Sequence, residues 1–308
     1  MYGFEQQIAA NRGRTAGLMV VFTMLMAALG WAAGYWVDPN TPEIGYLMLA
    51  GFMIFALIST GISYWYSDAI ITKMVNARPA NPTVYIEKYF IDSVEGLVLA
   101  CGLPAVPRCY IIDSPALNAF ATGRDPQHSL VAVTSGLLTA LDRQELEGVI
   151  AHEMSHIYDR DILLMGVAAV LVGGISMFCH LLLRMMMWGG GGGSRRDSKD
   201  SGCGPLMIVA LVLIILAPLF ANLLNLMISR KREFLADATS VKLTRNPEGL
   251  ISALTKISQS TEKMPFVESE LAGLFIDEPQ KKSATSGLAV LFATHPPIQE
   301  RIAALKAM

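Results

Sequence analysis

The sequence His152-Glu153-Met154-Ser155-His156 (HEMSH) carries two histidines four residues apart, with a carboxylate between them. On an α-helix, residues i and i+4 lie on one face, so both imidazoles can reach a single metal ion. Glu153 is rotated by about 100° from His152 and can reach a water bound to that ion. Zinc lowers the pKa of such a water to about 7, and Glu153 can take its proton as the water attacks a carbonyl. The stretch therefore predicts a zinc site that contains its own general base.

The residues before this motif predict that it lies inside a helix. Asp142 followed by Glu145 has the spacing of a capping box, which opens a helix. The segment continues with an apolar stripe at Leu146, Val149, Ile150 and Met154. The two histidines are therefore expected on one helical face, as the metal chemistry requires.

The composition argues against an ordinary soluble protein, because 53% of the 308 residues are hydrophobic and only 16% are charged. Four runs without a charged side chain are each long enough to cross about 30 Å of hydrocarbon. They are residues 15–37, 44–67, 162–183 and 205–229. The first run is too long to be a cleaved signal peptide. We therefore expect a mainly α membrane protein with four transmembrane helices.

Basic residues beside these runs predict the orientation in the membrane. Arg12 and Arg14 precede the first run, Lys73 and Arg78 follow the second, and three basic residues directly follow the fourth. By the positive-inside rule, these flanks face the cytoplasm. The loop 184–204 disagrees with the rule, because it is basic and yet lies outside in a four-span arrangement. We expect a multi-pass protein of the cell (inner) membrane with its catalytic site on the cytoplasmic side.

Charge and cysteine usage exclude some classes of function. The net charge is −2, and no basic patch is interleaved with aromatic residues, so nucleic acid is not an expected partner. The cysteines show no CxxC spacing and are interpreted as free thiols, which fits a cytoplasmic catalytic domain. They are Cys101, Cys109, Cys179 and Cys203.

The hydrophobic runs divide the chain into four parts. Residues 1–67 are expected to form an N-terminal transmembrane hairpin and residues 162–229 a second one, while 68–161 and 230–308 form the two parts of a catalytic domain. Periodicity predicts helices at 82–103, 230–243, 247–260 and 297–306, and strands at 108–113, 117–122 and 130–134. A small sheet therefore precedes the zinc helix. Residues 262–286 are polar and broken by prolines and a glycine, which predicts a loop.

Two histidines leave a catalytic zinc ion one protein ligand short. The acidic candidates include Asp159, Asp161, Glu233 and Asp237. Glu233 and Asp237 share a helix face, so Glu233 can bind the metal while Asp237 accepts the spare N–H of a ligand histidine. If the zinc helix ran on into the third run, His156 would stand roughly 9 Å above the start of that run, and Glu233 roughly 6 Å beyond the fourth. Both side chains would then meet just above the cytoplasmic surface of the membrane.

Three segments together are similar to a known family. They are PALNAFATGRDPQHSLVAVTSGLLTALDRQELEGVIAHEMSHIYDRD at 115–161, SRKREFLAD at 229–237 and THPPIQER at 294–301. These segments resemble the HtpX-type membrane metalloproteases, which are relatives of the CAAX prenyl endopeptidases among the gluzincins. The resemblance spans most of the chain in order, including the four hydrophobic runs. It implies a cytoplasmic α+β gluzincin-like zinc protease domain with a small β-sheet.

The resemblance also implies a site and a role. One Zn²⁺ per chain would be bound by His152, His156 and Glu233, with Glu153 as catalytic base and Asp237 supporting a ligand histidine. The expected activity is that of a zinc-dependent endopeptidase of the stress response and of protein quality control. Its expected partners are membrane lipid and damaged or unassembled membrane proteins, which it would cleave at the cytoplasmic face.

Residues 118–123 have β character and are a candidate substrate-binding strand. The residues are Asn118, Ala119, Phe120, Ala121, Thr122 and Gly123. An extended substrate can add to such a strand through main-chain hydrogen bonds, which explains low sequence specificity. The alternative is an ordinary edge strand and turn in which Asn118 caps the loop.

Three further residues are candidates for the site. The family pattern suggests that His295 and Arg301 approach the metal, where a donor stabilises the oxyanion of the tetrahedral intermediate. The alternative is a capping histidine and a surface arginine at the start of the last helix. Asp161 either forms a hydrogen bond within the site or interacts with Arg160 and the lipid headgroups.

Other functions remain open at this stage. A processing protease for lipidated C-terminal peptides would share the zinc site, although four spans argue against an enclosed chamber. A transporter or channel is a different class, but the four runs contain no Asp, Glu, Lys or Arg to bind an ion at mid-membrane. A non-catalytic zinc scaffold is the last alternative, and the intact Glu153 speaks against it. The sequence leaves the oligomeric state open.

Overall fold

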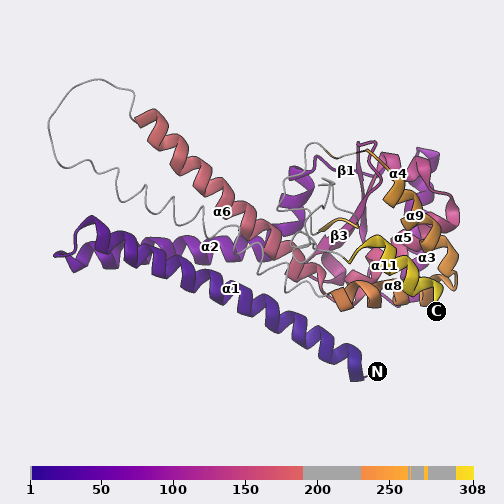
Figure 1. Cartoon of the computed structure of the whole chain (residues 1–308), viewed down its shortest axis with the longest axis horizontal. Coiled ribbons are helices and arrows are strands. Elements are labelled where there is room, and N and C mark those ends of the chain that lie inside the picture. The colour runs from indigo at the N-terminus through magenta and orange to yellow at the C-terminus, as the bar shows by residue number, and fades with distance from the viewer. Residues whose placement is uncertain (1, 190–229, 263, 265–273, 277–295) are drawn as a thin grey trace.

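In the computed structural model, the described residues are 2–189, 230–262, 264, 274–276 and 296–308. Three long helices extend from a body that holds a small sheet and the remaining helices (Figure 1). The long helices are α1 (Tyr2–Val37), α2 (Pro42–Met74) and α6 (Ile162–Gly189). The described part of the chain is thus mostly helical, as the sequence predicts.

Helices α1 and α2 form a hairpin in which Ala9–Tyr35 and Pro42–Met74 are each long and apolar enough to cross a membrane. A Cβ atom on Gly34 would lie 2.4 Å from Cα of Gly45, so glycine is required where the two backbones meet. Most of the exposed large apolar side chains of the described residues lie on these two helices. Such a surface suits contact with lipid.

Helix α6 begins at Ile162, and its part Ile162–Ile175 is apolar. It packs against both helices of the hairpin through a buried cluster that includes Phe22, Ala56 and Leu171. The fourth predicted run, 205–229, lies outside the described residues. Two helices of membrane-spanning length are therefore found among the described residues, and the total of four stays a prediction.

The sheet has four strands in the order β1-β2-β4-β3. They are β1 (Arg78–Pro79), β2 (Arg108–Ile112), β3 (Ala119–Gly123) and β4 (Ser129–Thr134). Strands β2 and β4 are parallel, and the other pairs are antiparallel. The Asp125 carboxylate accepts the N–H groups of Gln127 and His128 and so closes the β3–β4 turn. The three predicted strands are present, and β3 lies at one edge of the sheet.

The body holds the zinc helix predicted from the sequence, α5 (Arg143–Tyr158), and five further described α-helices. They are α3 (Tyr85–Cys101), α4 (Ser135–Ala140), α8 (Arg230–Thr244), α9 (Pro247–Gln259) and α11 (Ile298–Lys306). Helix α5 carries the HEMSH motif and opens with the predicted capping box, in which Asp142 and Glu145 each bind the backbone of the other. Glu145 also accepts hydrogen bonds from Ser252 and Lys256, which fasten α9 to the start of α5.

Helix α5 lies at the centre of the body, and every residue from Gly148 to Ile157 is buried. The Ser240 hydroxyl donates to the Gly148 carbonyl at 2.8 Å and thereby fixes α8 against α5. A Cβ at Gly148 would lie 2.9 Å from the Leu250 amide nitrogen, so the close approach of α9 requires glycine there. Because three helices and the sheet pack on α5, its side chains have little freedom.

The zinc helix does not run on into α6. The distances predicted for His156 and Glu233 above the membrane surface assumed that it did. Helix α5 ends at Tyr158, and Arg160 adopts a left-handed conformation with φ of +55° before α6 begins at Ile162. The Asn11 side chain donates to the Asp159 carbonyl at 3.2 Å, so α1 contacts this break. The break lets α6 leave the body in its own direction, and the third ligand is brought to the site by the packing of α8 on α5.

Candidate active site

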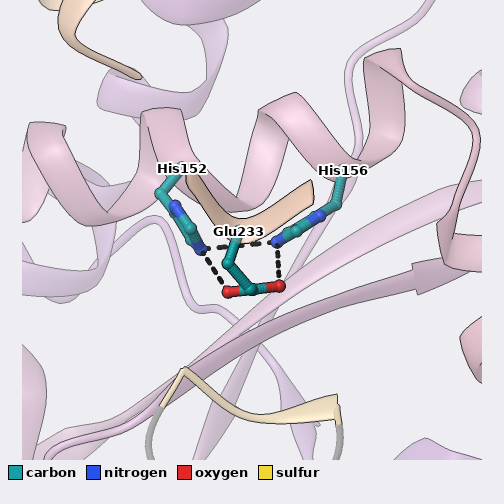
Figure 2. A group of neighbouring side chains, drawn as sticks. All are labelled: His152, His156 and Glu233. Carbon is teal, nitrogen blue, oxygen red and sulfur yellow. Dashed lines mark hydrogen bonds and ion pairs between the residues drawn. The ribbon is translucent and has the colours of Figure 1, made fainter. Parts of the chain in front are cut away.

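Two histidines of α5 face each other in the buried interior of the body. The Nε2 atoms of His152 and His156 lie 3.3 Å apart, and both side chains are buried. Two nitrogens held about 2.1 Å from one tetrahedral ion lie roughly 3.4 Å apart, so this spacing fits a shared zinc ion. Figure 2 shows that the two rings converge from successive turns of the helix.

The other ring nitrogen of each histidine is held by a carboxylate. His152 Nδ1 lies 3.0 Å from Asp237 Oδ1, and His156 Nδ1 lies 3.1 Å from Asp161 Oδ2. A carboxylate at Nδ1 favours the tautomer in which that nitrogen carries the proton, which leaves Nε2 with a lone pair. In the neutral form of each ring, Nε2 is therefore the nitrogen that can bind a metal ion.

Glu233 completes the group from the first turn of α8. Its carboxylate oxygens lie 3.6 Å from His152 Nε2 and 3.8 Å from His156 Nε2. One ligand atom from each of the three residues lies within 4.8 Å of the others, and all three side chains are buried (Figure 2). Two imidazoles and one carboxylate form the donor set of a catalytic zinc site, in which the fourth position is left for water or substrate.

Glu153 is buried beside these ligands on the same helix. It is close enough for its charge to raise the pKa values of His156 and Arg301. A carboxylate at this position can accept a proton from a water molecule near the metal and return it to a leaving group. The arrangement can therefore catalyse hydrolysis.

Arg301 of α11 lies beside Asp237 in the interior of the body. It is 0% exposed, which excludes the alternative of a surface arginine. Its Nε and Nη2 donate to the two oxygens of Asp237 at 2.9 and 2.7 Å. Its Nη2 also lies 3.3 Å from the His152 ring. Arg301 thus binds Asp237, which in turn binds His152. His295, the other predicted oxyanion donor, lies outside the described residues.

The charges of the site are strongly coupled. Burial disfavours the carboxylate form of Asp237, but Arg301 and His152 outweigh burial and lower the pKa of Asp237 to about 2. Burial likewise disfavours the imidazolium form of His156, but the adjacent carboxylates, Asp161 first among them, raise its pKa to about 10. A metal ion that binds His156 must therefore displace a proton, so acidic pH opposes binding.

Asp161 lies within the site, which settles one question that the sequence left open. Besides its contact with His156, its Oδ2 atom lies 3.5 Å from Arg232 Nη1. Sequence reasoning assigned Arg232 only to a basic cluster at the membrane surface. The sequence gives no signal for this contact, because neighbouring residues of a helix point about 100° apart. Asp159, another candidate ligand, is not in the metal-ligand group.

The candidate substrate strand β3 is buried along its whole length and lies between α5 and α6. The Asn118 side chain accepts the Ala119 amide N–H at 3.1 Å. On the outer edge, the Ala119 carbonyl accepts the Ile276 amide N–H at 3.1 Å. A part of the predicted loop 262–286 therefore touches the strand, and this contact has no signal in the sequence.

Asp237→Asn is expected to weaken zinc binding by about 10–100-fold, the usual effect of losing a group that orients a ligand histidine. The amide keeps the shape of the side chain but removes the charge that compensates Arg301 and His152. Zinc affinity is measured by competition with a chelating dye at constant pH. Asp92→Asn, at an exposed site on α3, serves as the control. Equal zinc affinity in the two variants would contradict the supporting role of Asp237.

Comparisons with known proteins place the chain in a family. The profile of peptidase family M48 matches residues 87–308. The chain belongs to peptidase family M48. As a member of this family it is a metalloendopeptidase, and the family consists of zinc metalloproteases. The M48 match includes α5, α8 and α11, which carry the metal-ligand group and Arg301.

Relatives of this M48 peptidase match it along almost its whole length. It is 45% identical over 305 residues to a protease HtpX homolog of Streptococcus gordonii, covering 98% of this chain and 99% of the relative. It is 43% identical over 302 residues to a protease HtpX homolog of Thermoanaerobacter pseudethanolicus, covering 97% and 96%. These matches confirm the resemblance to the HtpX-type proteases. Together with the two apolar helices, they identify a membrane metalloprotease.

One solved structure shares the fold. The crystal structure of S. mikatae Ste24p aligns with a TM-score of 0.51 at 18% sequence identity. The alignment covers 97% of this chain and 66% of that one, so the M48 peptidase spans about two thirds of the length of Ste24p. At this identity the likeness concerns the fold alone.

Proposed function

We propose that this M48 peptidase is a zinc-dependent endopeptidase that cleaves damaged or unassembled membrane proteins at the cytoplasmic face. The proposal rests on the position of the metal-ligand group at the base of an apolar helix. His156 contacts Asp161, and α6 begins at the next residue. A substrate segment that leaves the bilayer beside α6 therefore needs to travel only a short distance to the site.

Each residue of the site has a separate role in the proposed reaction. A bound zinc ion supplies a Lewis acid that brings the pKa of water close to neutrality and polarises the peptide carbonyl. Glu153 accepts a proton from the attacking water and donates it to the leaving nitrogen. Asp237 and Asp161 hold the two histidines in the tautomer that binds metal. The outer edge of β3 binds the extended substrate by main-chain hydrogen bonds.

The basic flanks of the hairpin support the proposed cytoplasmic location of the site. The N-terminal part of α1 and the C-terminal part of α2 both lie at the end of the hairpin nearer the body (Figure 1). Asn11, which precedes Arg12 and Arg14, contacts the break after the zinc helix. Because basic flanks remain in the cytoplasm, the body and its metal-ligand group are proposed to lie there as well.

Zinc removal tests the proposal directly. We expect purified protein in liposomes to cleave an unfolded membrane protein, to lose this activity on dialysis against a chelator, and to recover it when one equivalent of zinc is added. A prenylated C-terminal peptide is assayed in parallel. Cleavage of that peptide alone would instead indicate a processing protease, and cleavage that survives complete zinc removal would contradict the proposed mechanism.

A further inference from the structure

The outer edge of β3 has a defined set of backbone groups. Thr134 of β4 donates its amide N–H to the Asn118 carbonyl, and β3 continues this antiparallel pairing. In an antiparallel pair, alternate residues direct their N–H and C=O groups toward the partner strand. Ala119 and Ala121 therefore direct these groups to the outer edge. This edge is where the proposed function places an extended substrate.

Residues 274–276 of the chain already lie on this edge. Ile276 donates its amide N–H to the Ala119 carbonyl at 3.1 Å, and its carbonyl lies 3.5 Å from Arg301 Nη1. The same Nη1 atom lies 3.8 Å from Glu233 Oε2. Figure 2 shows this stretch as a short pale ribbon, grey at both ends, that passes below the three metal ligands. The Ile276 backbone thus joins the substrate strand to the metal-ligand group.

Packing holds these residues in place. Leu274, Phe275 and Ile276 are 4%, 0% and 2% exposed. The Phe275 ring meets the Phe120 ring edge to face, with centroids 5.1 Å apart, in a favourable aromatic geometry. Phe275 joins the cluster of buried residues that contains Phe120, whereas Ile276 joins the cluster around α5. The two side chains therefore pack into the two different clusters that lie on either side of β3.

We propose that residues 274–276 act as an internal segment that competes with substrate for the outer edge of β3. This inference rests on the proposed function, because it assumes that substrate binds to that edge. The Ala119 carbonyl and the space beside Phe120 cannot serve two chains at once, so substrate binds only after the internal segment has left. The occupant also indicates the substrate class, which is a segment with a bulky apolar side chain in the position of Phe275.

Competition of this kind has a kinetic signature. The apparent affinity for substrate is reduced by the fraction of molecules whose edge is open, whereas the rate at saturation is unaffected. A variant that weakens the contact of this internal segment with β3 is therefore expected to lower KM and to leave kcat unchanged. Loss of a residue that only contributes contacts to the substrate instead raises KM, because it weakens binding.

The test uses the zinc-loaded full-length protein and peptides that carry either Phe or Ala at one position. Ile276→Pro removes the N–H that binds Ala119, and it is expected to lower KM about five- to tenfold, as loss of one hydrogen bond allows. Ile276→Val keeps the N–H and is the matched control with the wild-type KM. Phe275→Ala is expected to lower KM more for the Phe peptide than for the Ala peptide. Its control is Phe90→Ala, which removes a phenyl ring from a buried position on α3.

The outcomes separate this inference from the proposed function. An unchanged or higher KM in Ile276→Pro, with zinc content and Tm equal to those of Ile276→Val, would show that residues 274–276 are a fixed wall and overturn the inference. If Phe275→Ala does not fold, the comparison at Ile276 decides alone. If the zinc-loaded wild type cleaves nothing beyond the rate of Glu153→Gln, the proposed function itself fails, whatever the variants at Ile276 and Phe275 do.

Discussion

Glu153→Gln is expected to bind zinc like the wild type and to lose peptide hydrolysis by roughly 10²–10⁴-fold, the usual contribution of a general base. Glutamine has the same shape as glutamate but cannot accept a proton at neutral pH. Because Glu153 is buried beside two ligands without belonging to the metal-ligand group, its replacement leaves the three donor atoms in place. Metal content and the rate of cleavage are measured on the same preparation.

Glu95→Gln is the matched control for this change, because Glu95 is exposed on α3 and distant in sequence from the site. The control variant is expected to retain the wild-type rate. If Glu153→Gln cleaves substrate as fast as Glu95→Gln does, another group acts as the base. If Glu153→Gln loses zinc together with activity, its role lies in holding the metal.

Glu233→Ala is expected to lose both the metal and the activity. The alanine removes one of three protein ligands, so zinc affinity should fall by more than the roughly 10–100-fold caused by losing a supporting group. The change also leaves fewer carboxylates to balance Arg232 and Arg301. Bound zinc is measured by elemental analysis after gel filtration, and activity is measured with and without added zinc.

The control for this prediction is Glu248→Ala, at an exposed position on α9. It is expected to bind one zinc ion per chain and to cleave at the wild-type rate. The two variants together distinguish a metal ligand from a carboxylate that only interacts with the dipole at the start of α8. Full zinc content in Glu233→Ala would show that a residue outside the group His152, His156 and Glu233 completes the site.

Local patterns account for what could be predicted along the chain. The capping box at Asp142 and the apolar stripe after it produce α5, because helix-forming signals act over three to four residues. The strands β2, β3 and β4 follow from short runs of β-forming residues bounded by turns. The HEMSH motif predicts a shared metal because the helix itself sets the spacing of its two histidines.

The third ligand required an argument across the chain, and one assumption in it was wrong. The distances predicted for His156 and Glu233 above the membrane assumed one continuous helix through the third hydrophobic run. In the structure, the helix is broken at Arg160, which has a positive φ. Glu233 nevertheless reaches His152 and His156, because Ser240 and its neighbours on α8 pack directly against α5. The prediction of Glu233 therefore rested more securely on the spacing to Asp237 than on the distance from the membrane.

By itself, the sequence determined the zinc helix, the apolar helices, the small sheet and the membership in a family of metalloproteases. Only the tertiary structure decided that Arg301 holds Asp237, that Asp161 serves His156, and that Ile276 lies on the edge of β3. The physical reason is sequence separation. Helix and strand signals act between near neighbours, whereas Arg301 and Asp237 are 64 residues apart and meet only because α11 packs against α8 and α9, which in turn pack against α5.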